Sequence, residues 1–268
     1  MPQVRKSGTA WERRLDDYAY TTGLDGPGWA WEFLRRNAAY AQDYRTNRAG
    51  HPVIEKHASG TLVLRLRRRV LDAENWGLYL FADPQKSLPH TQVFWLAERV
   101  KNAVSCRLHA ANDNDTDALS LAAFAGHRWV LVTPSDEIVV ISDRQHSACM
   151  VVRNSTFLIG VSTVTFEILG LNEVTQPIET LKTLRRLLSN RLVVETSQTD
   201  HHSKYLDYLV ALDGRLANRS YRDIAEVLYG TERIGPYWTD DSRGYKSKVR
   251  RAVENGLALM NGGYRSLL

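Results

Sequence analysis

The hydrophobic pattern changes twice along the chain, and this change constrains the fold more than any other sequence feature. The first 60 residues are rich in aromatic side chains, the next stretch contains short β-branched runs, and the residues from 176 onward repeat leucine at helical spacing. Periods of 2 and 3.6 residues suit strands and helices, respectively. We therefore predict an α+β fold in three regions: a small N-terminal helical domain (1–60), a central antiparallel β-rich region ending in a helix (61–195) and a C-terminal helical domain (196–268).

Short runs bounded by turn residues predict the strands of the central region. Their regular spacing favours an antiparallel sheet, with one helix expected at Asp117–Ala125. The polar stretch 112–117 has Asp at alternate positions, as a calcium loop begins, but Ala118 and Phe124 stand where such a loop needs Gly and Glu, so no calcium site is expected. The predicted strands are Thr61–Leu66, Leu78–Ala82, Val93–Trp95, Trp129–Thr133, Ile138–Ser142, Cys149–Val152 and Val161–Ile168.

Composition and motifs exclude several classes of protein. The chain has no run of eighteen uncharged apolar residues and no apolar segment behind Arg5 and Lys6, which argues against a membrane span and a secretory signal. Cys106 and Cys149 lack metal-ligand spacing. Nucleophile-elbow, zinc-protease, P-loop and dinucleotide motifs are absent from the sequence. We expect a cytoplasmic, non-enzymatic protein without metal or cofactor.

The C-terminal region reads as a series of amphipathic helices. One helix is predicted at Gln176–Asn190 and another from Lys204 to about Asn218. The next helix is predicted to begin after Ser220, which is a good N-cap and is followed three residues later by Asp223. Ile224, Ala225 and Leu228 share its inner face. Gly230 is expected to end it in the left-handed region. This order is typical of the second helix of a helix-turn-helix.

A long turn, Thr231–Thr239, separates that helix from the last one, and we expect Trp238 to pack it against the helices. The last helix is predicted at about Arg243–Met260, with Val249, Val253 and Gly256 toward the core. From Ser242 to the end the chain has six basic residues and one acidic residue. Such a local excess suits a phosphate backbone, although a charged helix face can also be merely solvated. The candidate DNA-binding residues are Arg219, Arg222, Arg243, Lys246, Ser247, Lys248, Arg250 and Arg251.

Two stretches resemble a known family. The N-terminal one resembles a transcriptional-regulator-like domain of proteobacterial mobile elements, in Tyr18-Ala19-Tyr20, Gly23-Leu24-Asp25, Trp29 to Asn37 and Asp43-Tyr44-Arg45. The C-terminal one resembles an extended-turn variant of the helix-turn-helix, in Tyr221 to Ala225, Trp238, Lys248 to Arg251, Gly256 to Met260 and Gly262 to Arg265. Together they look like FseA-type activators of integrative and conjugative elements.

This resemblance implies a function and partners. An activator of this type binds promoter DNA and activates the excision-factor gene, so that excision and conjugative transfer of the element follow. It also implies that a small acidic antiactivator competes for the N-terminal domain, and RNA polymerase is a further candidate partner. The aromatic excess near the N-terminus places the interdomain or partner docking surface at Trp29, Trp31 and Phe33, whose simpler interpretation is a small helical core.

Two other functional classes stay open. A protein-interaction antiactivator without DNA contact predicts an acidic or neutral last helix, against which the basic run Arg243 to Arg251 argues. A ligand sensor predicts a pocket in the strand region. The sequence does not reveal the promoter, the oligomeric state or which arginine reads a base.

Overall fold

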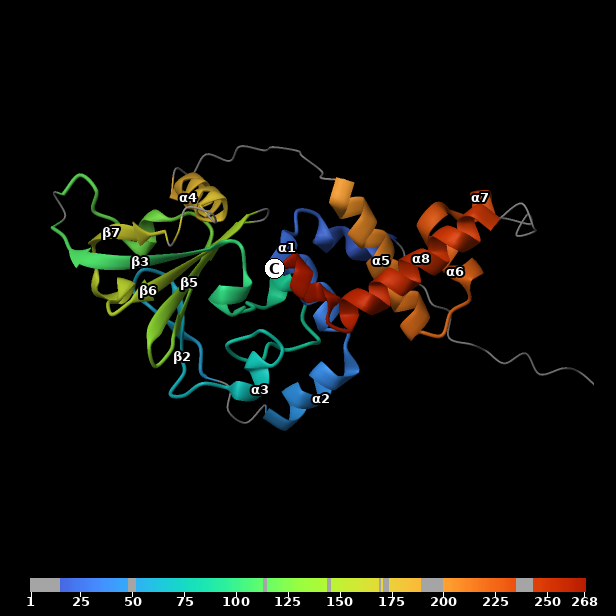
Figure 1. The fold of residues 1–268 in the computed structure, drawn as a ribbon, viewed down its shortest axis with the longest axis horizontal. Coiled ribbons are helices and arrows are strands. Elements are labelled where there is room, and N and C mark those ends of the chain that lie inside the picture. Colours follow the sequence, from blue (N-terminus) through green and yellow to red (C-terminus); the bar gives the residue numbers. More distant parts are fainter. Residues whose placement is uncertain are drawn as a thin grey trace, which may run out of the picture. The chain divides into compact units, whose positions relative to one another are not determined.

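The computed structural model of the chain describes residues 15–47, 52–112, 115–143, 146–168, 170, 174–188, 200–234 and 243–268 (Figure 1). The chain forms two compact units. One, called here the helical unit, comprises the residues up to Thr22 and residues 198–261, and the other, called the sheet unit, comprises residues 23–197 and 262–268. Each unit takes segments from both ends of the chain. The division into 1–60, 61–195 and 196–268 follows the sequence pattern and stays a prediction.

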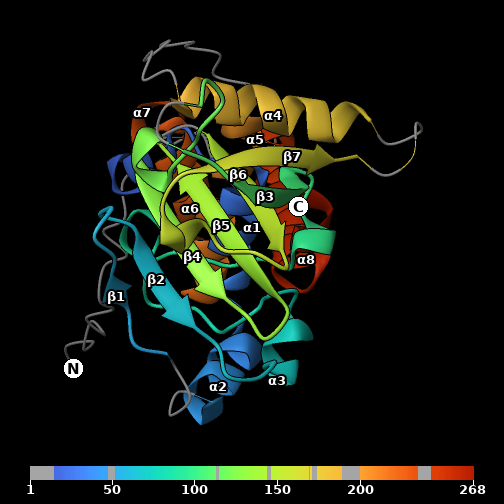
Figure 2. The same cartoon turned by 90° about the vertical axis from the view of Figure 1, so that its left-hand side faces the viewer.

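A seven-stranded sheet is the framework of the sheet unit, in the order β1-β2-β4-β5-β6-β3-β7. β4, β5 and β6 form an antiparallel meander, whereas β2 pairs parallel with β4 and β3 pairs parallel with β6. The α+β class is confirmed, but the sheet is mixed (Figure 2) and not wholly antiparallel as predicted. The strands are β1 (Glu55–Lys56), β2 (Leu62–Arg65), β3 (Ala103–Ala110), β4 (His127–Val132), β5 (Asp136–Ser142), β6 (Ser147–Arg153) and β7 (Ser162–Glu167).

Both faces of the sheet are buried. Alternate residues of β5 point to opposite sides, so that Val139 and Ile141 join one apolar cluster and Ile138 joins the other. Helix α4 (Thr175–Leu188) covers the first face, and its Leu184 and Leu187 belong to the cluster on that face. The helix predicted at Gln176–Asn190 is confirmed within its described residues.

The predicted strands Leu78–Ala82 and Val93–Trp95 are wrong, because only an isolated bridge from Leu78 to Trp95 joins them. They form irregular segments whose apolar side chains cover the second face of the sheet. The eight-residue strand β3 was not predicted, since its sequence, AVSCRLHA, holds a single β-branched residue. The helix expected at Asp117–Ala125 is reduced to a short 3-10 helix, η5 (Leu121–Ala123).

The remaining helices of the sheet unit are short. Asp25 caps the first, because its Oδ1 accepts a hydrogen bond from the Gly28 amide at 2.9 Å and Pro27 occupies the first turn, where its missing N–H costs nothing. The helix ends at Leu34, and Arg35 is its C-cap. The elements are α1 (Gly26–Leu34), α2 (Ala38–Asn47), α3 (Leu71–Glu74), and the 3-10 helices η3 (Leu88–His90), η4 (Ala97–Arg99), η6 (Phe157–Ile159) and η8 (Gly263–Leu267).

The segment after residue 261 belongs to the sheet unit and packs on α1. The Tyr264 hydroxyl donates to the carbonyl of Trp76 at 2.9 Å, and the Lys101 amide donates to the carbonyl of Leu268 at 3.1 Å. A Cβ on Gly26 would lie 2.2 Å from the carbonyl oxygen of Leu267, so the close approach of α1 and η8 requires glycine.

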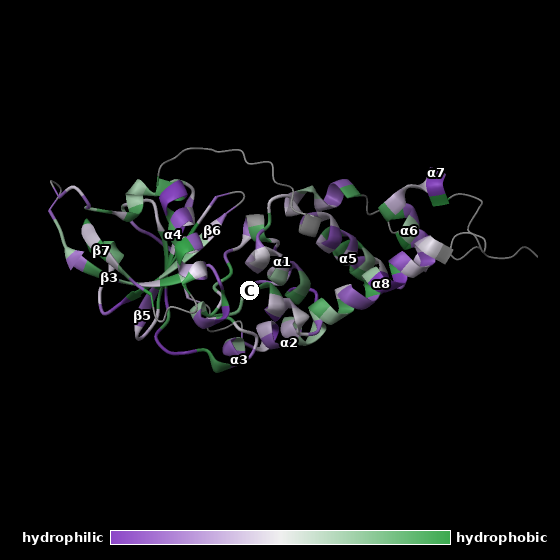
Figure 3. Ribbon diagram, turned by 45° about the horizontal axis from the view of Figure 1, so that its top comes forward, coloured by the Kyte–Doolittle hydropathy of each residue, from purple (hydrophilic) through white to green (hydrophobic). Residues whose placement is uncertain are grey.

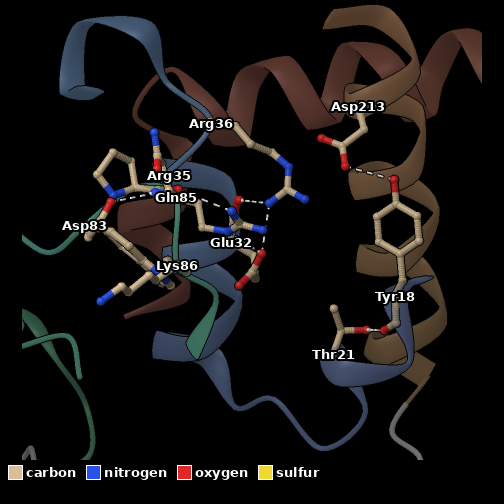
Figure 4. Close-up of polar contacts among 11 residues, drawn as sticks. Tyr18, Thr21, Glu32, Arg35, Arg36, Asp83, Gln85, Lys86 and Asp213 are labelled. Atoms are coloured by element: carbon tan, nitrogen blue, oxygen red, sulfur yellow. Dashed lines mark hydrogen bonds and ion pairs between the residues drawn. The ribbon is translucent and has the colours of Figure 1, made fainter. Parts of the chain in front are cut away.

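The helical unit consists of η1 (Leu15–Thr21), α5 (Asp200–Leu216), α6 (Tyr221–Tyr229), α7 (Thr231–Ile234) and α8 (Arg243–Met260). Its core gathers small and branched side chains from α5 to α8, among them Ala211, Ile224, Ala225 and Val253. η1 packs on α5, where the buried Tyr18 donates its hydroxyl to Asp213 Oδ2 at 2.8 Å (Figure 4). Among the described residues, no helix is long and apolar enough to cross a membrane.

Helix α6 begins as predicted. The Ser220 hydroxyl accepts a hydrogen bond from the Asp223 amide at 3.2 Å, and the Asp223 carboxylate accepts one from the Ser220 amide at 3.0 Å, a reciprocal capping box. Gly230 ends the helix with a φ of +89°, as a non-glycine residue rarely does. The segment predicted as a turn, Thr231–Thr239, starts instead with the short helix α7, whose Ile234 is buried in the core. Trp238, expected to pack this turn against the helices, lies outside the described residues.

Helices α5 and α8 cross at Gly256. A Cβ at this position would lie 2.6 Å from the carbonyl oxygen of Tyr208 and 3.0 Å from Leu212 Cβ, so the two helices can approach this closely only at glycine. At Gly244, near the start of the same helix, an ideal Cβ meets no atom within 4 Å among the described residues beyond the helix's own backbone and the adjoining residues. The two glycines of α8 therefore have opposite structural roles.

We predict that Gly256→Ala lowers the free energy of unfolding by about 1–3 kcal/mol, because the added methyl group must push α5 and α8 apart. Gly244→Ala is the matched control and is expected to raise it by up to about 1 kcal/mol, since alanine is the better helix former and meets open space. Urea denaturation followed by circular dichroism measures both. Equal effects of the two substitutions would contradict this packing.

Candidate nucleic-acid interface

Helix α8 has an apolar face and a basic face. Val249, Ala252 and Val253 are buried in the core of the helical unit, as the spacing predicts for Val249 and Val253. Arg250 and Arg251 are exposed between these buried positions in the sequence. Figure 3 shows the corresponding alternation of hydrophilic and hydrophobic residues along α8. The helix thus presents cations to solvent from a backbone held in place by the core.

The intramolecular partners of these arginines are weak. Arg250 Nε lies 3.8 Å from Glu254 Oε1, and both side chains are about three-fifths exposed, at 61% and 64%. Arg251 Nε donates to the carbonyl of Ser247 at 3.4 Å. Exposed ion pairs of this kind contribute little to stability, so an incoming phosphate can replace them at small cost. Both guanidinium groups remain accessible.

The other predicted residues of α8 differ in their surroundings. Lys248 is exposed, and its Nζ lies 5.8 Å from the centre of the Tyr245 ring, whereas Lys246 and Ser247 are half-buried. Arg243 begins the helix, but its side chain lies outside the described residues.

Arg219 and Arg222 lie at the start of α6. Arg222 Nε pairs with Glu226 Oε1 at 2.9 Å, one turn further along, and its side chain is 48% exposed. Arg219 is half-buried, and its amide donates to the carbonyl of Gly214 at 2.9 Å. α6 packs on α8 in the core, so the structure brings both helices of the predicted interface into one unit.

A carboxylate that the sequence does not reveal lies close to the basic face. Burial raises the pKa of Asp207 on α5, and the charge of Lys248 lowers it in part. The Tyr229 and Tyr245 rings lie beside this pair, with centroids 5.1 Å apart. Burial raises the pKa of Tyr229, and the negative charge of Asp207 raises it further. Asp207 therefore weakens the positive potential around Lys248. Asp207 and Lys248 are distant in sequence, so no local pattern pairs them.

The aromatic residues predicted to form a docking surface are buried in the structure. Trp29 is 3% exposed, and Trp31 and Phe33 are 0% exposed. Trp31 belongs to the interior of the sheet unit, because its Nε1 donates to the carbonyl of Lys86 at 3.0 Å and its ring packs edge-on against Tyr40. A docking role for Trp31 would require this core to open, and the docking assignment stays a prediction.

The same helix buries a charge cluster. Glu32 is fully buried, and its Oε2 pairs with Arg35 Nε at 2.7 Å and Arg36 Nη1 at 2.9 Å (Figure 4). A buried carboxylate needs such partners, because a buried charge without a partner is strongly destabilising. Arg35 and Arg36 thus serve the fold of the sheet unit and belong to no exposed basic surface.

A cleft of about 290 Å³ bears on the alternative of a ligand sensor. It lies in the sheet unit, and the polar groups of its wall bond to one another: the Ser147 hydroxyl donates to Asp25 and accepts from Asn102 Nδ2. Burial raises the pKa of Asp25, and these hydrogen bonds oppose the rise. The lining residues include Asp25, Lys101, Asn102, His146, Ser147 and Thr180.

Comparison with known protein families matches both ends of the chain. Residues 172–268 match the family model described as "T6SS, Transcription factor, DNA binding domain". This matched segment contains the whole of α8 and its basic face. Residues 8–79 match a "Proteobacterial transcriptional regulator-like domain". No curated protein matches the chain. Two independent matches to regulator domains, one at each end, agree with a basic helix exposed on a packed helical core. The chain is therefore a transcription regulator, and its C-terminal part carries a DNA-binding domain.

Proposed function

We propose that this regulator binds promoter DNA through the basic face of α8 and activates the excision-factor gene of an integrative and conjugative element. The observation that carries the first half is the exposure of Arg250 and Arg251 on a helix whose other face is buried in the core. A helix held in this way presents several side chains at fixed spacing, as entry into a major groove requires.

Each group on this face has a separate role in the proposal. A guanidinium group reads guanine through its O6 and N7 atoms, so Arg250 and Arg251 are candidates for base contact. Lys248 is a point charge at the edge of the face and suits a phosphate. Arg222, at the start of α6, is positioned on the helix that in a helix-turn-helix crosses the backbone.

The proposed identity of the regulated gene rests on the resemblance of both ends of the chain to FseA-type activators. A second candidate target follows from the family model, whose description names T6SS. Both candidates use the same DNA-binding surface and differ in the promoter that it recognises.

We predict that Arg250→Glu combined with Arg251→Glu lowers affinity for the target promoter by at least about tenfold and reduces the salt dependence of binding, because two phosphate- or base-directed cations become anions. Fluorescence anisotropy with labelled duplex at several salt concentrations measures both quantities. The control is Lys182→Glu with Arg185→Glu, which makes the same charge change on two exposed positions of α4. If the α8 variant binds like this control, the DNA face is wrongly assigned.

Asp207→Asn is expected to raise affinity for duplex DNA at pH 7 by about twofold to fivefold, because it removes a negative charge beside Lys248. The pKa of Asp207 is raised, so its charge is lost earlier than usual as the pH falls, and the gain should shrink toward acidic pH. Asp16→Asn, an exposed position on η1, is the control. A gain that is equal for both variants would show that only net charge matters.

The regulated gene can be tested with reporter fusions. Expression of the regulator should raise transcription from an excision-factor promoter and leave an unrelated promoter unchanged, and the α8 double variant should abolish the rise. Activation confined to a T6SS promoter would replace the excision assignment with the second candidate.

A further inference from the structure

An arginine cluster in the sheet unit lies outside the matched DNA-binding domain. The segment Arg65-Leu66-Arg67-Arg68-Arg69 places four arginines within five residues. Residues 60–200 as a whole have fifteen basic and fifteen acidic residues, so this cluster is a local departure from a neutral background. It connects β2 to α3, a path that can be followed in Figure 1.

The cluster is exposed, and Leu66 at its centre holds it in place. All four arginines are exposed. The Leu66 amide donates to the carbonyl of Val132 at 2.8 Å, and the Leu66 side chain packs against an apolar cluster of the sheet. The turn is therefore anchored to the framework of the unit at its centre.

The two outer arginines are paired and the two inner ones are not. Arg65 Nε lies 3.4 Å from Glu55 Oε2, and Arg69 Nε donates to Glu74 Oε1 at 2.8 Å, with its Nη2 on the other carboxylate oxygen. Within the part of the chain that the structure describes, the side chains of Arg67 and Arg68 make no hydrogen bond, ion pair or ring contact. The neighbouring carboxylates of Glu55 and Glu74 thus orient the flanking arginines, and the described residues offer no partner to the guanidinium groups of Arg67 and Arg68.

We propose that Arg67 and Arg68 form a second contact with the phosphate backbone of the DNA that the regulator binds. Two adjacent free guanidinium groups on an anchored turn repel each other, and a polyanion relieves this repulsion. A guanidinium group donates two parallel hydrogen bonds to a phosphate and remains charged at any physiological pH. Phosphate contacts carry no sequence information, so this site adds affinity and does not read the promoter.

This proposal requires that the regulator binds DNA, as proposed above. It does not require that α8 is the helix that contacts the bases. Arg67→Ala with Arg68→Ala should reduce the slope of log affinity against log salt by about two, because each phosphate contact contributes roughly 0.9 to that slope. Affinity for the promoter and for a scrambled duplex should fall by the same factor. The control, Arg45→Ala with Arg153→Ala, removes two exposed arginines of the same unit elsewhere.

Hydroxyl-radical footprinting of the full chain supplies a second readout. The double variant should lose protection at one end of the footprint and keep the part that the α8 variant loses. An unchanged salt slope and footprint would overturn the proposal, and so would a loss restricted to the promoter sequence. If Arg67 and Arg68 instead bind an acidic protein, their replacement would leave the salt dependence of DNA binding unchanged. If the α8 variant binds normally while this one does not, the proposed reading helix fails and the second contact stands.

Discussion

The close crossing of α5 and α8 at Gly256 is the packing constraint on which the proposed interface depends. Because the α8 backbone lies against the carbonyl of Tyr208, the rotation of α8 about its own axis is determined by the core. Val249 and Val253 then face inward, which leaves Arg250 and Arg251 on the outside. Small residues on the neighbouring helices, Ala211 and Ala225, allow the same tight packing. The direction of the charges thus follows from an apolar core that contains none of them.

In the helical unit, the partly buried carboxylate of Asp207 offsets part of the positive charge on α8. Asp207 lies near Lys248 at the cost of desolvation, which raises its pKa. A carboxylate beside a DNA-binding face reduces affinity for every sequence equally, whereas base contacts by arginine distinguish one sequence from another. The carboxylate therefore leaves the ratio of specific to non-specific affinity to the base contacts, while weaker binding to all sequences shortens the time spent at non-specific sites. Asp207 is thus compatible with a regulator that must find one promoter among many other sites.

Local signals in the sequence predicted local structure well. Ser220 and Asp223 determine the start of α6 by bonding to each other, and the spacing of Val249, Val253 and Gly256 determines the buried face of α8. Long-range pairing was not predictable: β3 has few β-branched residues and owes its strand to partners on both sides, and the parallel pairing of β2 with β4 joins segments far apart in the chain. Leu216 belongs to the helix predicted from Lys204 to about Asn218, yet it is 47% exposed, because the last turn of α5 extends beyond the core. No local sequence pattern distinguishes Arg67 and Arg68 from Arg65 and Arg69, and the structure shows that the two outer arginines pair with carboxylates while the inner two have no partner among the described residues.

The folding units and the family matches divide the chain differently, and this difference bears on which fragments can function. The matched DNA-binding segment, residues 172–268, contains α4, whose Leu184 and Leu187 belong to the core of the sheet unit. It lacks η1, which supplies Tyr18 to Asp213 of α5. A fragment cut at these bounds would expose an apolar face of α4 and leave Asp213 without its hydroxyl donor. The helical unit therefore includes residues from both ends of the chain, so its stability depends on η1 as well as on α5 to α8.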